Sequence, residues 1–66
     1  MNKVIDKAIS ECGSREQLAT ACGVSVMTVS NWVRGFGIKA KHIKSISDAT
    51  NGKVSVDEIL QSLTED

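Results

Sequence analysis

The chain has 66 residues, of which 41% are hydrophobic and 24% charged, and its eight basic side chains balance eight acidic ones. This length leaves room for one small domain spanning residues 1–66, because a second core would need roughly 50 residues of its own. The composition is typical of a soluble globular domain and argues against a disordered chain. No apolar run approaches the ~20 residues of a membrane span, and Asp6 interrupts the stretch where a signal peptide is apolar. We therefore expect a cytoplasmic protein without a membrane partner.

The balanced total conceals an uneven distribution of charge along the chain. Residues 1–44 carry seven bases against three acids, whereas residues 45–66 carry one base against five acids. Such an asymmetry predicts a basic binding face followed by an acidic tail.

The two cysteines, Cys12 and Cys22, are ten residues apart, and neither belongs to a CxxC motif. This spacing excludes a zinc ribbon and a thioredoxin-like motif. Because both have apolar neighbours at helical spacing, we expect buried, reduced thiols, although a disulfide stays open from the sequence.

Five glycines divide the chain into segments of helical length, and there is no proline. The first segment ends at Gly13, and its apolar residues have the spacing of an amphipathic helix. Ser14 and Gln17 form an S-x-x-Q capping box that predicts a second helix, which ends at Gly23. The expected buried residues of these two helices are Val4, Ile5, Ala8, Ile9 and Cys12, and then Leu18, Ala19 and Cys22.

Three more helices are expected after Gly23. Ser25 is placed to cap a third helix that stops at Gly35, and a fourth helix begins at about Ala40. Ser55 and Glu58 form a second capping box, which opens a last helix whose final few residues we expect to fray. The alternation of Val54 and Val56 leaves a short strand as a minor alternative. The expected apolar positions are Val26, Val29, Trp32 and Val33, then Ile43, Ile46 and Ala49, then Val56, Ile59, Leu60 and Leu63.

The stretch from Arg15 to Arg34 carries the functional signal. Two predicted helices meet there at a tight turn containing Gly23, and Ala19 is small enough for the helices to cross closely. Val29 and Trp32 are three residues apart and attach the second of these helices to the core. Its opposite face has short polar or apolar side chains and no acid, which suits a helix lying in the major groove of DNA.

This pattern resembles the helix-turn-helix of the lambda-repressor-like phage regulators. The run Val29-Ser30-Asn31-Trp32-Val33-Arg34-Gly35 and the later run Ala49-Thr50-Asn51-Gly52-Lys53-Val54-Ser55 are similar to the Cro-like group that includes the YdaS-type prophage regulators. The resemblance covers about residues 5–60 and implies an all-α, lambda-repressor-like bundle of about five short helices with a helix-turn-helix over about residues 15–34. One departure is Lys39, where that group commonly has proline, so we expect a looser start of the fourth helix.

The resemblance also implies roles for individual residues. Base-reading side chains would lie at the start of the second helix of the motif and one turn further on: Val26, Met27, Thr28, Ser30 and Asn31. An asparagine pairs bidentately with adenine, and an apolar side chain contacts a thymine methyl. Phosphate contacts would come from both ends of the motif and from the start of the fourth helix: Ser14, Arg15, Gln17, Arg34, Lys39, Lys41 and His42.

Each of these residues also has a purely structural interpretation. Met27 fills a gap in the core in that alternative, Asn31 is a plain solvent residue, and Arg34 complements the negative end of its helix. Lys41 and Lys44 then form a solvated face. Trp32 is expected in the core, and His42 is too isolated for a metal ligand or a general base.

The function favoured by these features is sequence-specific repression of transcription, of Cro type, by a phage or prophage protein in a bacterial host cell. A weak homodimer on a pseudo-palindromic DNA operator is expected, because one recognition helix reads only a few base pairs. The alternative is an antitoxin-like regulator that binds a protein partner through its acidic half. The sequence has no HExxH, GxSxG or P-loop, so we expect no enzyme, no cofactor or metal, and no small-molecule ligand. Apolar side chains beyond the needs of the core, and so available for dimerisation, are Phe36, Val54, Val56, Leu60 and Leu63.

Overall fold

A computed structural model describes residues 2–64 of the chain. It contains five α-helices in this order: α1 (Lys3–Cys12), α2 (Arg15–Cys22), α3 (Val26–Val33), α4 (Ala40–Ala49) and α5 (Val56–Thr64). The expected all-α bundle of five short helices is confirmed, and the alternative strand around Ser55 is absent from the described residues. The expected fraying of the last few residues concerns Glu65 and Asp66, which lie outside the described residues.

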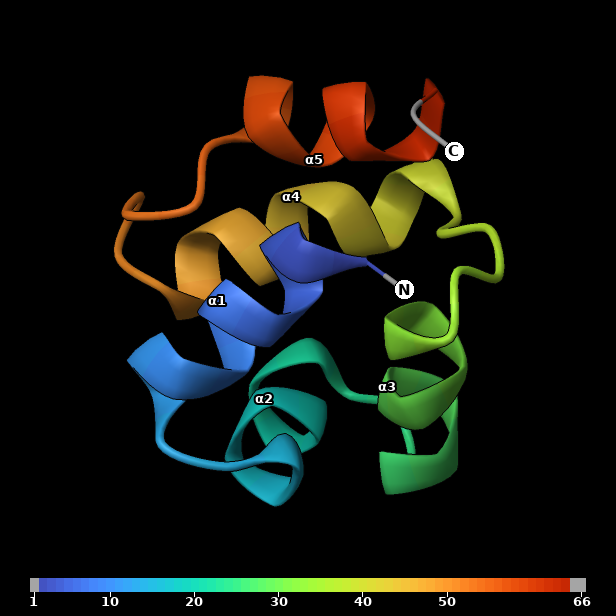
Figure 1. Cartoon of the computed structure of the whole chain (residues 1–66). Coiled ribbons are helices and arrows are strands. Elements are labelled where there is room, and N and C mark those ends of the chain that lie inside the picture. Colours follow the sequence, from blue (N-terminus) through green and yellow to red (C-terminus); the bar gives the residue numbers. More distant parts are fainter. Residues whose placement is uncertain (1, 65–66) are drawn as a thin grey trace.

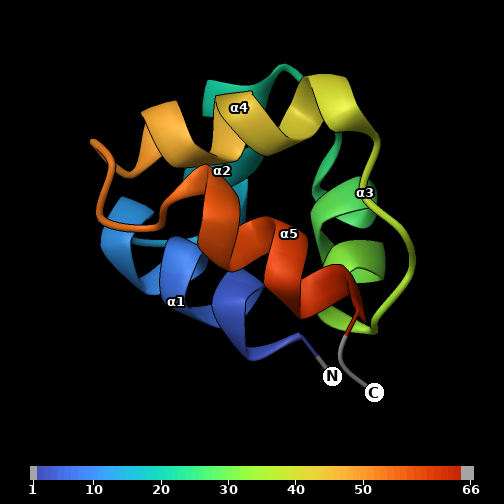
Figure 2. The same ribbon diagram turned by 90° about the horizontal axis from the view of Figure 1, so that it is seen from above.

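The helices surround one apolar core (Figures 1 and 2). Helix α1 contacts all four other helices, whereas α5 packs against α1 and α4 and completes the side of the bundle away from α2 and α3. The core is built from the residues that helical periodicity placed inside, together with Ile38 and Val54 from two connections: Ile5, Ala8, Leu18, Ala19, Val29, Trp32, Val33, Ile38, Ile43, Ile46, Val54 and Ile59.

The two predicted capping boxes differ in completeness. In the box that opens α5, the Glu58 N–H donates to Ser55 Oγ over 3.1 Å, and the Ser55 N–H donates to Glu58 Oε1 over 3.4 Å. At the start of α2, the Gln17 N–H donates to Ser14 Oγ over 3.2 Å. The Gln17 amide lies over Gly13, where a Cβ would collide with it, and does not return a bond to the Ser14 backbone. The expected S-x-x-Q box is therefore only half formed.

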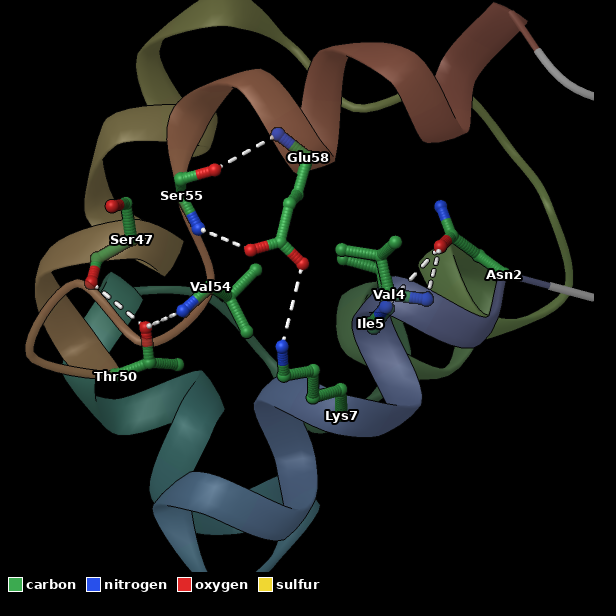
Figure 3. A network of polar contacts seen from close by, with 9 residues as sticks. All are labelled: Asn2, Val4, Ile5, Lys7, Ser47, Thr50, Val54, Ser55 and Glu58. Atoms are coloured by element: carbon green, nitrogen blue, oxygen red, sulfur yellow. Dashed lines mark hydrogen bonds and ion pairs between the residues drawn. The ribbon is translucent and has the colours of Figure 1, made fainter.

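The connection between α4 and α5 is held by the buried Thr50 (Figure 3). Its Oγ1 donates to the Ser47 carbonyl over 2.9 Å and accepts from the Val54 N–H over 3.1 Å. Asn51 has a left-handed backbone with φ of 56°, which reverses the chain. Val54 is thereby drawn into the core with no exposed surface, so the interpretation of Val54 as a spare apolar residue is wrong.

Other apolar residues stay outside the core. Val56, Leu60 and Leu63 of α5 keep 37–47% of their surface exposed, and Ile59 is the fully buried residue of that helix. Val26 is also exposed at the start of α3. Val56, Leu60 and Leu63 thus match the expectation of apolar side chains beyond the needs of the core, and Val26 matches its expected place on the solvent face of α3.

Candidate nucleic-acid interface

Helices α2 and α3 are joined by a three-residue turn with helix-turn-helix connectivity. The Val24 N–H donates to the Ala19 carbonyl over 3.0 Å and the Gly23 N–H to the Thr20 carbonyl over 3.2 Å, which is the hydrogen-bond pattern of a Schellman motif. Gly23 has a left-handed backbone with φ of 71°, a conformation that glycine adopts without a steric penalty. Helix α3 can therefore begin directly after this three-residue turn, in a new direction (Figure 1).

The N-terminus of α3 is fixed by its cap. The Thr28 N–H donates to Ser25 Oγ over 3.2 Å, and the two hydroxyl oxygens lie 3.0 Å apart. The Thr28 hydroxyl, predicted to reach bases or phosphates, is thus tied to the cap in this structure. Its side chain is half-buried, and the hydroxyl must release Ser25 or share its hydrogen bond before it can contact DNA.

The buried and exposed faces of α3 divide as the motif predicts. Val29, Trp32 and Val33 are buried, while Thr28, Ser30 and Asn31 are half-exposed. Met27 is 74% exposed, which excludes its alternative role as a core gap-filler. The five predicted base-reading residues therefore share the solvent side of the helix.

Two hollows flank this side of α3, and Asn31 lines both of them. One, also of about 410 Å³, is formed by α3 and the Arg34 that follows it: Val26, Met27, Ser30, Asn31 and Arg34. The other is a groove of about 410 Å³ between α3 and the segment that leads into α4. Its lining includes Thr28, Asn31, Phe36, Lys39 and His42. Asn31 is thus the predicted reader that can approach a ligand lying over either hollow.

The predicted phosphate-contacting residues lie on both sides of α3. Arg15 and Gln17 are exposed at the start of α2, beside the half-buried Ser14. Arg15 also reaches α3, because its Nη1 donates to Ser30 Oγ over 3.2 Å. Arg34, Lys39 and Lys41 are exposed after α3 and at the start of α4. Sequence reasoning missed the Arg15–Ser30 contact, since no local spacing relates two residues that are fifteen positions apart.

His42 is held differently from the other predicted phosphate contacts. Its ring is half-buried and packs at a tilt of 49° on Trp32, with ring centroids 5.5 Å apart. Nδ1 is buried and has no hydrogen-bond partner among the described residues. A phosphate contact from this side chain must therefore use the other ring nitrogen.

The charge around α3 has one sign over a long stretch of chain. No acid occurs between Glu16 and Asp48, whereas Arg34, Lys39, Lys41 and Lys44 fall inside this interval. Two acids outside it are paired on the far side of the bundle, where Lys7 Nζ lies 3.4 Å from Glu58 Oε2 and Lys53 Nζ lies 3.3 Å from Glu11 Oε1. The chain from Gln17 to Ser47, which includes α3 and both of its connections, therefore carries bases and no acid.

The comparisons with known proteins relate the whole bundle to one family. The sequence profile described as "Bacterial toxin YdaS" matches residues 5–62. The chain belongs to this family. The match with the YdaS family extends from α1 into α5 and includes every predicted DNA-contact residue. Neither the curated proteins nor the solved structures gave a match.

Two further features of the described residues bear on the class of site. No group of three His, Cys, Asp or Glu side chains within residues 2–64 is arranged to hold a metal ion. None of the helices over the same residues has the length and apolarity that crossing a membrane requires.

Proposed function

We propose that this YdaS-family protein is a sequence-specific DNA-binding repressor of Cro type from a phage or prophage, and that it has no enzymatic activity. The observation that carries the proposal is the solvent side of α3. It presents small and amide side chains, without an acid, between basic residues at the start of α2 and the start of α4. An α-helix with such a face fits the major groove, where short side chains reach base edges.

In the proposed complex, base reading and backbone contact are separate tasks. Asn31 reads an adenine through its amide, and Val26 or Met27 contacts a thymine methyl, with Thr28 and Ser30 beside them. The phosphates of one strand lie against the start of α2, and those of the other strand lie against the segment that leads into α4. The residues for these contacts are Ser14, Arg15 and Gln17 on one side and Arg34, Lys39, Lys41 and His42 on the other.

The proposed operator is a pseudo-palindrome bound by two copies of the chain. One recognition helix covers only a few base pairs, so a single copy discriminates weakly between sequences. Two copies on adjacent half-sites multiply the discrimination. Repression is steric in this proposal: the bound dimer overlaps a promoter and excludes polymerase in the cytoplasm of the bacterial host cell.

The test compares two substitutions on two DNA probes. The probes are a duplex from the region upstream of the protein's own gene and the same duplex scrambled, each titrated at several salt concentrations. Asn31→Ala should cost about 1–3 kcal/mol on the upstream duplex, the usual value of a bidentate base contact, and should change little on the scrambled one. Lys41→Ala should weaken both probes alike and reduce the salt slope by about one unit.

Two outcomes would contradict the proposal. If the unmodified protein does not distinguish the two duplexes at any salt concentration, it is not a sequence-specific binder of that region. If Asn31→Ala weakens both duplexes equally, α3 is not the reading helix.

A second candidate function follows from the description of the family, which is that of a bacterial toxin. In this alternative the protein works in a toxin–antitoxin setting, as a toxin or as an antitoxin-like regulator that binds a protein partner, and any DNA binding is autoregulatory. Expression of the chain alone in a bacterial host, with Asn31→Ala as the matched control, separates the two. Growth arrest that persists in Asn31→Ala supports the second candidate, whereas arrest that needs Asn31 supports action through DNA.

A further inference from the structure

Three apolar side chains form a stripe on α5 that the bundle does not cover. Val56, Leu60 and Leu63 are 38%, 47% and 37% exposed, and their spacing places them on one face of the helix. We call these three residues the α5 stripe. Single exposed apolar residues are ordinary, whereas three on one helix face form a candidate interaction surface.

The orientation of α5 fixes where this stripe points. On one flank of the helix Glu58 pairs with Lys7 over 3.4 Å (Figure 3). On the same flank Ser62 Oγ accepts a hydrogen bond from Asn2 Nδ2 over 3.1 Å. Both partners belong to the α1 side of the bundle. Ile59 points into the core, and at about 100° per residue the α5 stripe lies on the flank opposite Glu58 and Ser62. It therefore faces solvent on the α4 side.

Charge around the stripe is polarised from one end to the other. Helices α4 and α5 run in opposite directions in both views (Figures 1 and 2), so the last turn of α4 and the first turn of α5 lie toward the same end of the bundle. Asp48 in the last turn of α4 and Asp57 in the first turn of α5 make one end acidic. Lys44 in the first half of α4 makes the other end basic. Asp48, Asp57 and Lys44 are exposed and lack an ion pair among the described residues.

We propose that a second copy of the chain docks on this surface, with its α5 antiparallel to the first α5 and a two-fold axis near Leu60. In a two-fold contact both partners use the same patch, and each end of the patch on one copy faces the opposite end of the patch on the other. The acidic end of each copy then meets the basic end of the other, and the two stripes are buried together. DNA does not fit this surface, because Asp48 and Asp57 repel phosphate.

The size of the stripe sets the strength of this contact. Three half-exposed side chains bury much less than the roughly 800 Å² per partner of a standard stable interface. The free protein is therefore a weak dimer, and it tightens when two copies sit on one DNA duplex, since the second contact is then intramolecular. This consequence on DNA rests on the proposed function, whereas the docking of the free chains does not.

The test uses two charge reversals, Asp57→Lys and Lys44→Asp, studied without DNA by sedimentation equilibrium. Each variant alone should dimerise about tenfold more weakly than the unmodified chain, because both contacts of its homodimer become like-charge pairs. An equimolar mixture of the two variants should recover the unmodified affinity. In that heterodimer a lysine at 57 meets an aspartate at 44, and an aspartate at 57 meets a lysine at 44.

A second pair of variants tests the stripe itself. Leu60→Asp should abolish dimerisation, whereas Phe36→Asp, which adds the same charge at an exposed apolar residue of the groove beside α3, should leave it unchanged. Circular dichroism of each variant checks that the helices are retained.

Several results would overturn the assignment. One is a free chain that stays monomeric at millimolar concentration. Another is a mixture of Asp57→Lys and Lys44→Asp that dimerises no more tightly than either variant alone. A third is a greater loss of dimerisation in Phe36→Asp than in Leu60→Asp. Because no DNA is present, these results leave the proposed DNA binding standing. Conversely, a protein that dimerises as described but binds no DNA overturns the proposed function alone.

Discussion

The Arg15 guanidinium donates from Nη1 to Ser30 Oγ over 3.2 Å and so joins the start of α2 to the middle of α3. This contact holds a base of the predicted phosphate set against a residue of the predicted reading set. Ser30 has one oxygen lone pair engaged, and its hydroxyl proton remains available for a base acceptor. We therefore expect the two side chains to act as a unit on DNA.

The first prediction concerns this unit. In a double-mutant cycle of Arg15→Ala and Ser30→Ala, the losses in binding to the upstream duplex should be non-additive by about 0.5–3 kcal/mol, as for other residues in contact. Arg15→Ala combined with Asn31→Ala, which share no hydrogen bond, should be additive within about 0.5 kcal/mol. Equal coupling in both cycles would show that the Arg15–Ser30 contact is not kept on DNA.

The second prediction concerns the start of α4. Lys39 has φ of −69°, which lies within the range that proline fixes, and no hydrogen bond from its backbone N–H is seen among the described residues. Lys39→Pro should therefore raise the free energy of unfolding by about 0.4–1 kcal/mol through a less flexible unfolded chain. Chemical denaturation measures this effect. Lys39→Ala is the control, since it removes the same charge without restricting the backbone, and a lower stability for the proline variant than for alanine would refute the argument.

The third prediction concerns acid. The hydrogen bond from the Ser55 N–H, followed by the charge of Lys7, holds the pKa of Glu58 below its ordinary value of 4.5. A pKa lowered by folding contributes stability that is present above pH 4.5 and is lost as the pH falls through the lower value of the folded state. The melting temperature should thus drop on acidification in this range, and Glu58→Gln should show a flatter profile. Asp57→Asn, which removes an acid without an ion pair, should keep the slope of the unmodified chain.

The fourth prediction concerns the thiols. Burial, with a smaller contribution from the nearby Cys12, raises the pKa of Cys22 to about 11, and burial likewise raises the pKa of Cys12. Both cysteines are free, so iodoacetamide at pH 8 should alkylate them far more slowly in the folded protein than in denaturant, because the thiolate reacts and the thiol does not. Rapid labelling of Cys22 in the native state would contradict the predicted protection.

Helical periodicity and capping residues were sufficient to predict the five helices and most of the core. Local rules work at these positions: Ser14, Ser25 and Ser55 each cap the helix that follows, and residues such as Ile5, Leu18 and Ile46 fall on the inward face. The prediction that Val54 lies outside the core was wrong. Its burial depends on Thr50 and on the left-handed Asn51, which together redirect the chain. The exposure of Val56, Leu60 and Leu63 agrees with the expectation that these residues exceed what a small core needs.

The sequence was sufficient to predict which face of α3 forms the candidate site. It was not sufficient to predict the side-chain contacts that join this face to other helices. The spacing of Val29 and Trp32 located the buried side of α3, and Asn31 followed on the open side. The packing of His42 on Trp32 and the bond of Arg15 to Ser30 join separate helices, and such tertiary pairs leave no mark in a single sequence.

The contact between Asn2 and Ser62 has a consequence for how the bundle opens. Asn2 caps α1 by accepting from the Val4 and Ile5 N–H groups, donates from its own N–H to the Val33 carbonyl over 2.9 Å, and holds Ser62. The start of α1 is thereby fastened to a residue of α5 that lies sixty positions away in the chain, in addition to the Lys7–Glu58 pair between the same helices. Helix α1 cannot unfold locally without breaking its contacts with α5, and the same holds for α5. The amide protons of both helices should therefore exchange with solvent through one shared opening, at a common free energy. Terminal helices usually exchange in a graded order instead.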